Sequence, residues 1–205
     1  MFGFGQKTEI DIPEETTGLL PSIEYFNKRY GVKGWTQGYL ISLGIGQGEL
    51  GVSPLQMAGY CSALANSGIY YQPHLVKFLK NPISGELTPV NYKKRELEIN
   101  KEYFDIIRKG MFYVVNGSGT AHGIRTSLVE ICGKTGTAQN PHGRDHSWFI
   151  AFAPYENPRI AVCVLVENAG FGAAVAAPIA QRIILKYLFG LSDESEVIEI
   201  KGEPD

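Results

Sequence analysis

Gly133-Lys134-Thr135-Gly136-Thr137 is the segment that decides the fold. It lies within a short apolar stretch, residues 128–138, and two further apolar runs follow it at residues 148–153 and 160–167. Those two runs are separated by Pro-Tyr-Glu-Asn-Pro at residues 154–158, a strong turn sequence. The three runs therefore predict consecutive strands with antiparallel hairpin pairing, and the first strand carries Lys134.

Composition places the chain among ordinary globular proteins and excludes several function classes. The 205 residues are 44% hydrophobic and 20% charged, with a formal net charge of −2. This charge gives no electrostatic case for nucleic acid or an anionic membrane as a partner. The sequence contains no run of about 18 apolar residues and no signal-peptide pattern at its N-terminus.

Helices are predicted in four places. Residues 22–30 can form a short helix, and Ser53-Pro54 predicts an N-cap followed by proline at the first helical position. That second helix is expected to end near residue 66, with Gly68 as its stop signal. Its predicted buried face consists of Met57, Cys61, Leu64 and Ala65.

Two later helices show clear apolar periodicity. Asn100 is expected to cap the first of them, whose stripe is Tyr103, Ile106, Ile107, Gly110, Met111, Val114 and Val115. The stripe of the last helix, expected to lie buried against the sheet, is Ala176, Ile179, Ala180, Ile183, Ile184, Tyr187 and Leu188.

The remaining segments are predicted as loops, one hairpin and a tail. Residues 69–90 are expected to form a β-hairpin that turns at residues 81–85, Asn-Pro-Ile-Ser-Gly. Residues 1–190 are assigned to one domain. Residues 191–205, rich in acids with little to bury, are assigned to a disordered tail.

Several catalytic and binding motifs fail on their spacing. Residues 46–51 match G-x-G-x-x-G, but the following helix begins too late and no acid stands about 20 residues on, so we interpret them as a tight glycine turn. A P-loop would need glycine where Leu128 stands, and no G-x-S-x-G elbow occurs.

The sequence predicts neither a metal site nor a disulfide framework. His142 and His146 are four residues apart but lie among loop residues, so no metal site is predicted. The three cysteines, Cys61, Cys132 and Cys163, are widely spaced and are expected to be buried thiols. No cofactor is expected.

Lys134-Thr135-Gly136-Thr137 has a chemistry that suits recognition of a peptide carboxylate. An edge strand offers free backbone N–H groups, and glycine lets a ligand approach the backbone closely. Lysine supplies a point charge for a carboxylate, and the threonine hydroxyls add hydrogen bonds. A solvated lysine on an edge strand is the simplest alternative, because a tripeptide of common residues also occurs by chance.

Over nearly its whole length the chain resembles the C-terminal part of the transpeptidase domain of class B penicillin-binding proteins, in particular the elongation type, penicillin-binding protein 2. The resemblance lies in residues 2–13 with 18–21, 42–49 with 52–58, 133–139 and 147–154. It implies an α/β (α+β) fold in which helices pack on an antiparallel sheet, here incomplete. It also implies a serine D,D-transpeptidase that cross-links peptidoglycan and is acylated by β-lactams.

The resemblance assigns roles to four residues. Lys134 would bind the terminal carboxylate of the substrate, with hydroxyls from Thr135 and Thr137 nearby. Gly136 completes the motif, and the backbone N–H of Thr137 would form half of the oxyanion hole. Residues 139–146 would border the cleft.

The family's other two motifs, Ser-x-x-Lys and Ser-x-Asn, are absent from these 205 residues. We therefore expect a truncated domain that is inactive alone and comes from an active parent. A D,D-carboxypeptidase, a β-lactamase relative or a non-catalytic β-lactam sensor are the alternatives. Expected partners are stem peptides, β-lactams and a membrane glycosyltransferase, with the domain on the periplasmic side of the cytoplasmic membrane and a membrane anchor only in the missing N-terminal part.

Overall fold

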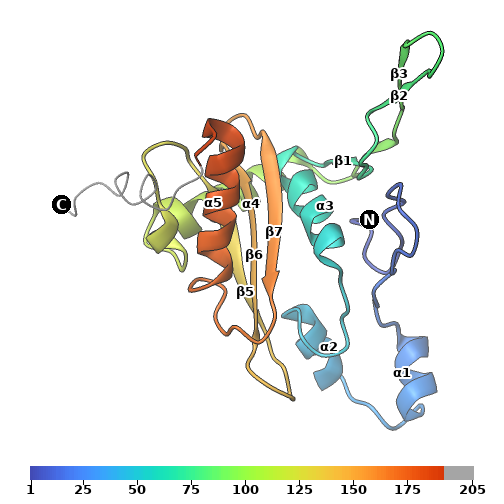
Figure 1. Ribbon diagram of the computed structural model, residues 1–205. Helices are drawn as coiled ribbons and strands as arrows, with labels where there is room; N and C mark the ends of the chain where they lie inside the picture. Colours follow the sequence, from blue (N-terminus) through green and yellow to red (C-terminus); the bar gives the residue numbers. More distant parts are fainter. Residues whose placement is uncertain (192–205) are drawn as a thin grey trace.

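The computed structural model describes residues 1–191, and its centre is a three-stranded antiparallel sheet (Figure 1). The strands are β5 (Cys132–Ala138), β6 (His146–Ala153) and β7 (Ile160–Val166), in the order β5-β6-β7. In the register, Lys134 lies opposite Ile150 and Ile150 lies opposite Cys163. The three predicted strands and their order are thus confirmed.

Helices cover both faces of this sheet (Figure 1). On β6, Phe149 and Ala151 point into one core with α5 (Ala176–Phe189), while Ile150 and Phe152 point into a second core with α3 (Pro54–Ala65). Because both faces are covered, β6 is buried along most of its length and reads as a continuous apolar run rather than an alternating one.

The predicted helix boundaries around α3 are confirmed. The Ser53 hydroxyl accepts a hydrogen bond from the Gln56 N–H (3.1 Å), and the Gln56 side chain accepts one from the Ser53 N–H (2.9 Å), which makes a full capping box. At the other end Gly68 has φ +97°, and its N–H donates to the Ala63 carbonyl at 2.8 Å. A left-handed glycine of this kind ends the helix without steric cost.

Helix α4 (Lys101–Asn116) is capped by Asn100 as predicted, but its predicted apolar stripe is only partly buried. Phe104, Met111 and Val115 are buried, whereas Tyr103, Ile106 and Ile107 are 61%, 65% and 47% exposed. The row of residues that faces the core includes Arg108. Apolar periodicity predicts that a charged residue at this position faces solvent.

Arg108 belongs to this row because its guanidinium has hydrogen-bond and aromatic partners on other elements. Its guanidinium donates to the Ser67 hydroxyl (3.2 Å) and to the Tyr155 carbonyl, and it lies over the rings of Phe152 and Tyr155. This residue therefore ties α4 to the α3–β1 turn and to the β6–β7 turn.

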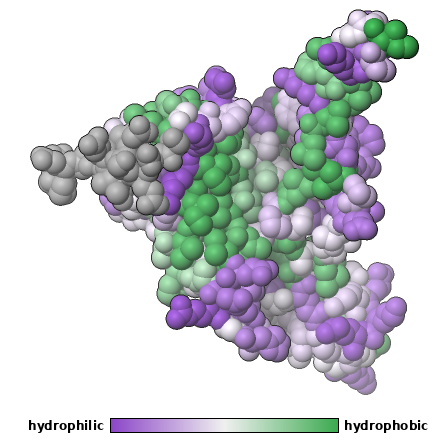
Figure 2. Space-filling model, viewed as in Figure 1, coloured by the Kyte–Doolittle hydropathy of each residue, from purple (hydrophilic) through white to green (hydrophobic). Residues whose placement is uncertain are grey.

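The predicted stripe of α5 is also only partly correct. Ala176, Ala180 and Ile184 are buried as expected, but Ile179, Ile183 and Tyr187 are 36%, 44% and 62% exposed. The helix buries a row shifted toward Ala177, Gln181 and Leu185, and the buried Gln181 amide donates to the Ile124 carbonyl at 2.9 Å. Figure 2 shows hydrophobic surface over α5 on the visible face.

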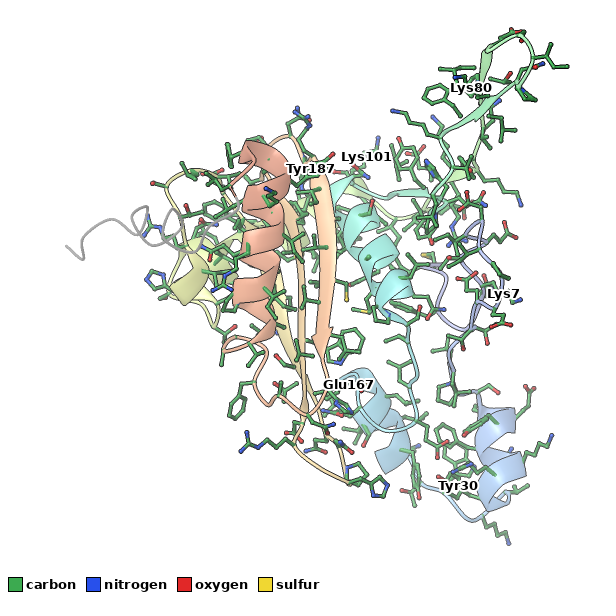
Figure 3. The ribbon with its side chains drawn as sticks, viewed as in Figure 1. Lys7, Tyr30, Lys80, Lys101, Glu167 and Tyr187 are labelled. Atoms are coloured by element: carbon green, nitrogen blue, oxygen red, sulfur yellow. The ribbon has the colours of Figure 1, made fainter. Side chains whose placement is uncertain are left out.

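The predicted hairpin over residues 69–90 is corrected by the structure. The turn at residues 81–85 does join β2 (Phe78–Lys80) to β3 (Leu87–Pro89), but β1 (Ile69–Tyr71) pairs with β4 (Lys94–Glu96) instead. The β2–β3 arm leaves the body of the molecule, and Lys80 lies far out on it (Figures 1 and 3).

Asp11 holds the root of the β2–β3 arm. Its carboxylate accepts hydrogen bonds from the N–H groups of Leu75 (2.8 Å) and Val76 (2.9 Å) and from the Tyr92 hydroxyl (2.9 Å). These three hydrogen bonds tie the segment where the chain leaves the β1–β4 pair to the N-terminal region.

The N-terminal region contributes α1 (Ile23–Tyr30), as predicted, and α2 (Gly38–Gly44), joined through aromatic contacts of Phe26 with Trp35 and Tyr39. A 3₁₀ turn, η1 (His122–Ile124), follows α4. Among residues 1–191 no helix is long and apolar enough to cross a membrane. Of the predicted tail at residues 191–205, all but the first residue lies outside the described residues.

Candidate functional site

Strand β5 is paired with β6 on one side only, and within residues 1–191 no strand adjoins its other edge. The carbonyls of Thr135 and Thr137 face this outer edge, because they accept hydrogen bonds from the Lys134 ammonium (2.8 Å) and the Gln47 amide (3.0 Å). In an antiparallel ladder the N–H and C=O of one residue point to the same side. The N–H groups of Thr135 and Thr137 therefore also face the outer edge.

Lys134 is exposed, and within residues 1–191 no ion pair involves it. Its ammonium donates only to the carbonyl of its own neighbour, Thr135. A carboxylate accepts a charge-assisted hydrogen bond from an ammonium more strongly than a neutral carbonyl does. The lysine is therefore available to a carboxylate ligand at this edge.

Thr135 lies on the opposite face of β5 from Lys134, and its hydroxyl is 3.0 Å from the hydroxyl of Thr120. Thr120 belongs to the loop that follows α4, 15 positions earlier in the chain. No sequence motif connects the two residues, so sequence reasoning missed Thr120.

Gln47 is the second residue that sequence reasoning missed. It stands between Gly46 (φ +77°) and Gly48 (φ +73°), so the glycine turn predicted from residues 46–51 is present. Its amide donates to the Thr137 carbonyl (3.0 Å) and accepts from the Gln139 N–H (3.3 Å). Gln47 thus pairs with the end of β5 as a short piece of neighbouring strand would.

Three glycines let the backbone of β5 pack closely. A Cβ at Gly133 would lie 2.3 Å from the Phe149 ring, and one at Gly136 would lie 3.1 Å from the Trp148 Cβ. Gly172, in the loop before α5, approaches so closely that its Cβ would lie 2.5 Å from the Gly136 carbonyl oxygen. The motif strand is therefore packed closely on both of its faces.

Residues 139–145 form the turn between β5 and β6, at the same end of the sheet as Glu167 (Figure 3). His146 opens β6, and its Nδ1 accepts a hydrogen bond from the Asn168 N–H at 3.1 Å. In the part of the chain that the structure describes, no group of three His, Cys, Asp or Glu side chains is arranged to hold a metal ion.

The cysteines contribute to the core on the α3 side of the sheet. Cys61 and Cys132 are buried and Cys163 is half-buried, which confirms the prediction for two of the three. Burial raises the pKa of the Cys132 and Cys163 thiols to about 12 each, and it also raises that of Cys61. These thiols stay protonated at neutral pH and are not nucleophiles there.

Comparison with known proteins places this geometry in a family. The profile described as penicillin binding protein transpeptidase domain matches residues 1–185. The chain belongs to this family. The matched region contains all three strands of the central sheet and α5 up to residue 185, and together with the solved relatives below it confirms the predicted fold class.

Individual relatives are penicillin-binding proteins of the MrdA or PBP2 type. The chain is 38% identical to the peptidoglycan D,D-transpeptidase MrdA of Haemophilus influenzae over 91% of its own length and 31% of that protein. The solved Pseudomonas aeruginosa PBP2 in complex with WCK 5153 is 40% identical with a TM-score of 0.79, covering 94% of this chain and 42% of that one.

PBP2 of Helicobacter pylori, solved in complex with MreC, is 31% identical with a TM-score of 0.75, over 93% of this chain and 34% of that chain. The chain thus spans less than half the length of each of these relatives. Strand β5 carries the sequence Lys-Thr-Gly at residues 134–136.

Proposed function

We propose that this chain forms the Lys-Thr-Gly side of the active site of a peptidoglycan D,D-transpeptidase of the PBP2 type. The observation that carries the proposal is the open edge of β5, where an unpaired lysine, a threonine hydroxyl and outward N–H groups lie together. The family membership supports it. Because no serine in these 205 residues has lysine three positions on, the proposal assigns the nucleophilic serine to a segment outside them.

Each residue of the edge has a distinct role in this proposal. The Lys134 ammonium leaves the Thr135 carbonyl and binds the terminal carboxylate of the stem peptide, and the Thr135 hydroxyl donates to the same carboxylate. The Thr137 N–H, which faces the edge, donates to the oxyanion. The Thr137 hydroxyl adds a further donor near the carboxylate.

The reaction then follows the acyl-transfer scheme. The serine oxygen attacks the carbonyl carbon of the penultimate D-alanine, and the negative charge that develops on the carbonyl oxygen is met by the Thr137 N–H. The C–N bond breaks and the terminal D-alanine leaves with a proton. The amine of a second stem peptide attacks the resulting ester, forms the cross-link and returns the serine with its proton.

Location and partners follow from the same proposal. Peptidoglycan cross-linking takes place on the periplasmic side of the cytoplasmic membrane, where an anchor outside residues 1–205 would hold the domain. The Helicobacter pylori relative was solved with MreC, so a partner of that type is proposed for this protein, beside a membrane glycosyltransferase. β-Lactams would acylate the same serine.

The test is a two-substrate assay on the full-length transpeptidase that carries this chain. A stem-peptide donor ending in D-Ala–D-Ala and an acceptor amine should give a cross-linked product, and fluorescent penicillin should block it. Release of D-alanine without a cross-link would indicate a D,D-carboxypeptidase instead. Penicillin labelling without turnover of either kind would indicate a sensor.

A further inference from the structure

Thr120 is a polar residue beside the proposed site that has no assigned role. It lies in the glycine-rich loop at residues 117–123, and its hydroxyl oxygen is 3.0 Å from the hydroxyl oxygen of Thr135. Among residues 1–191, this contact is the only hydrogen bond of the Thr135 hydroxyl. The contact thus fixes the environment of a group that the proposed function uses directly.

The loop that carries Thr120 is held in place on both sides of it. The Ala121 N–H donates to the Val114 carbonyl at 3.0 Å, and Ala121 is buried in the core on the α5 side. Gly119 lies so close to α4 that a Cβ there would come within 2.4 Å of the Val114 Cα. Because α4 itself packs against β5, the Thr120 hydroxyl has a defined position relative to Thr135.

The direction of the hydrogen bond between the two hydroxyls follows from the ligand. Each hydroxyl has one hydrogen to donate and two lone pairs, and an ionised carboxylate only accepts. When Thr135 gives its hydrogen to a ligand carboxylate, Thr120 must be the donor to Thr135. A hydroxyl that accepts one hydrogen bond while donating another is also a better donor, because the two bonds polarise each other.

We infer that Thr120 is a positioning residue that donates to the Thr135 hydroxyl and thereby aims the Thr135 hydrogen at the carboxylate of the bound substrate or β-lactam. The inference rests on the proposed function. Thr120 does not touch the ligand in this arrangement, so its whole effect passes through Thr135. The contact exists in the non-covalent complex, so it acts on binding before acylation.

The experiment measures acylation of the full-length transpeptidase by benzylpenicillin in the wild type, Thr120→Val, Thr120→Ser, Thr135→Val and the Thr120→Val/Thr135→Val double variant. Thr120→Val keeps the shape and removes the hydroxyl, and it should lower the second-order acylation rate about 3- to 10-fold. The loss should appear in the dissociation constant of the non-covalent complex more than in the acylation step. Thr120→Ser, which restores the hydroxyl, should recover most of the rate.

The double variant separates positioning from a general structural effect. If Thr120 acts through Thr135, adding Thr120→Val to Thr135→Val should change the rate by less than about 2-fold. An equal loss in both backgrounds, or no loss from Thr120→Val alone, would overturn the inference. Ser118→Ala is the matched control, because Ser118 is an exposed hydroxyl residue of the same loop and should leave the rate unchanged.

Two further measurements complete the design. Melting temperatures of all variants should agree within a few degrees, which shows that Thr120→Val acts on binding and not on folding. A wild-type protein that benzylpenicillin does not acylate would contradict the proposed function itself. A wild type that is acylated, with Thr120→Val acylated equally fast, would contradict only the role of Thr120.

Discussion

Lys134 stands on a strand whose glycines leave the backbone bare on alternate faces. Gly133 is buried against Phe149 and Gly136 lies against Trp148, so neither position has room to spare for a larger side chain. The lysine between them is exposed, and within residues 1–191 it donates only to a neutral carbonyl. This combination of a tightly packed strand and a free cation is what favours a recognition role over that of a solvated surface lysine.

Replacing Lys134 with alanine in the full-length transpeptidase should slow acylation by benzylpenicillin while leaving the fold intact. A charge-assisted contact to a ligand carboxylate contributes about 1.5–3 kcal/mol, which corresponds to about 10- to 150-fold in rate. Second-order acylation rates, measured with melting temperatures beside them, test this prediction.

The choice of variants sharpens the Lys134 test. Lys134→Arg should rescue the rate only in part, because a forked guanidinium does not replace a compact ammonium at a close edge. Lys80→Ala, on the distant β2–β3 arm, is the control for losing one surface charge. If Lys134→Ala is acylated at the wild-type rate, the lysine is only a solvated strand residue.

Gly133→Ala should destabilise the domain through overpacking. The added Cβ would lie 2.3 Å from the Phe149 ring, whose side chain is fully buried, so the strand or the ring must move. Such strain costs about 1–3 kcal/mol, which denaturant unfolding can detect. Gly110→Ala, in α4 with nothing within 4 Å of the new Cβ, is the control and should stabilise slightly.

Among the helices and strands, local signals predicted boundaries well and faces poorly. The Ser53 cap, the Gly68 stop and the Asn100 cap are short-range features that involve few residues, and all three are confirmed. The buried row of α4 depends instead on Arg108 finding partners on two other elements. Apolar periodicity cannot reveal a half-buried arginine, so the predicted stripe was correct only at Met111 and Val115 among the buried residues.

In the candidate site, too, the sequence predicts the local motif but not the residues that reach it from elsewhere in the chain. Lys134, Thr135, Gly136 and Thr137 form a contiguous motif, and sequence alone could place it on an edge strand. Thr120 and Gln47 reach that strand from 15 and 90 positions away in the chain, measured to Thr135 and Thr137. Their side-chain types are common and their spacing follows no rule, so only the folded chain reveals them.

The β2–β3 arm should lose its anchor in acid. Hydrogen bonds from the backbone of Val76 and Leu75 lower the pKa of Asp11 below its usual 3.8. A carboxyl group whose pKa is lowered on folding stabilises the folded state at pH values above its pKa in the unfolded chain. This stabilisation is lost as the pH falls through its pKa in the folded protein. Amide exchange at Leu75 and Val76 should therefore accelerate below about pH 4, beyond the intrinsic pH dependence of exchange.

Asp11→Asn is the matched variant for this pH test, because its amide oxygen accepts only part of the same hydrogen bonds and does not titrate in this range. It should show faster exchange at neutral pH and no further step in acid. The exchange rates are corrected for the intrinsic pH dependence of amide exchange. If the Leu75 and Val76 amides of the wild type then stay equally protected from pH 6 to pH 3, the anchoring role of Asp11 is contradicted.

At the scale of the whole molecule, the sheet and its two cores hold one side of the proposed active site in place, but residues 1–191 supply no activated nucleophile. No serine in the sequence has lysine three positions on, and the thiols of Cys61, Cys132 and Cys163 have raised pKa values. The open edge of β5 can bind and orient a ligand, but covalent chemistry requires a serine from another segment.

Intact-mass spectrometry after incubation with benzylpenicillin tests this account most directly. The account predicts that the full-length transpeptidase gains the mass of one penicilloyl group, whereas residues 1–205 alone, verified as folded by amide exchange, gain none. Covalent labelling of residues 1–205 alone would contradict the assignment of the nucleophile to another segment. A full-length protein that remains unlabelled would contradict the proposed serine transpeptidase function.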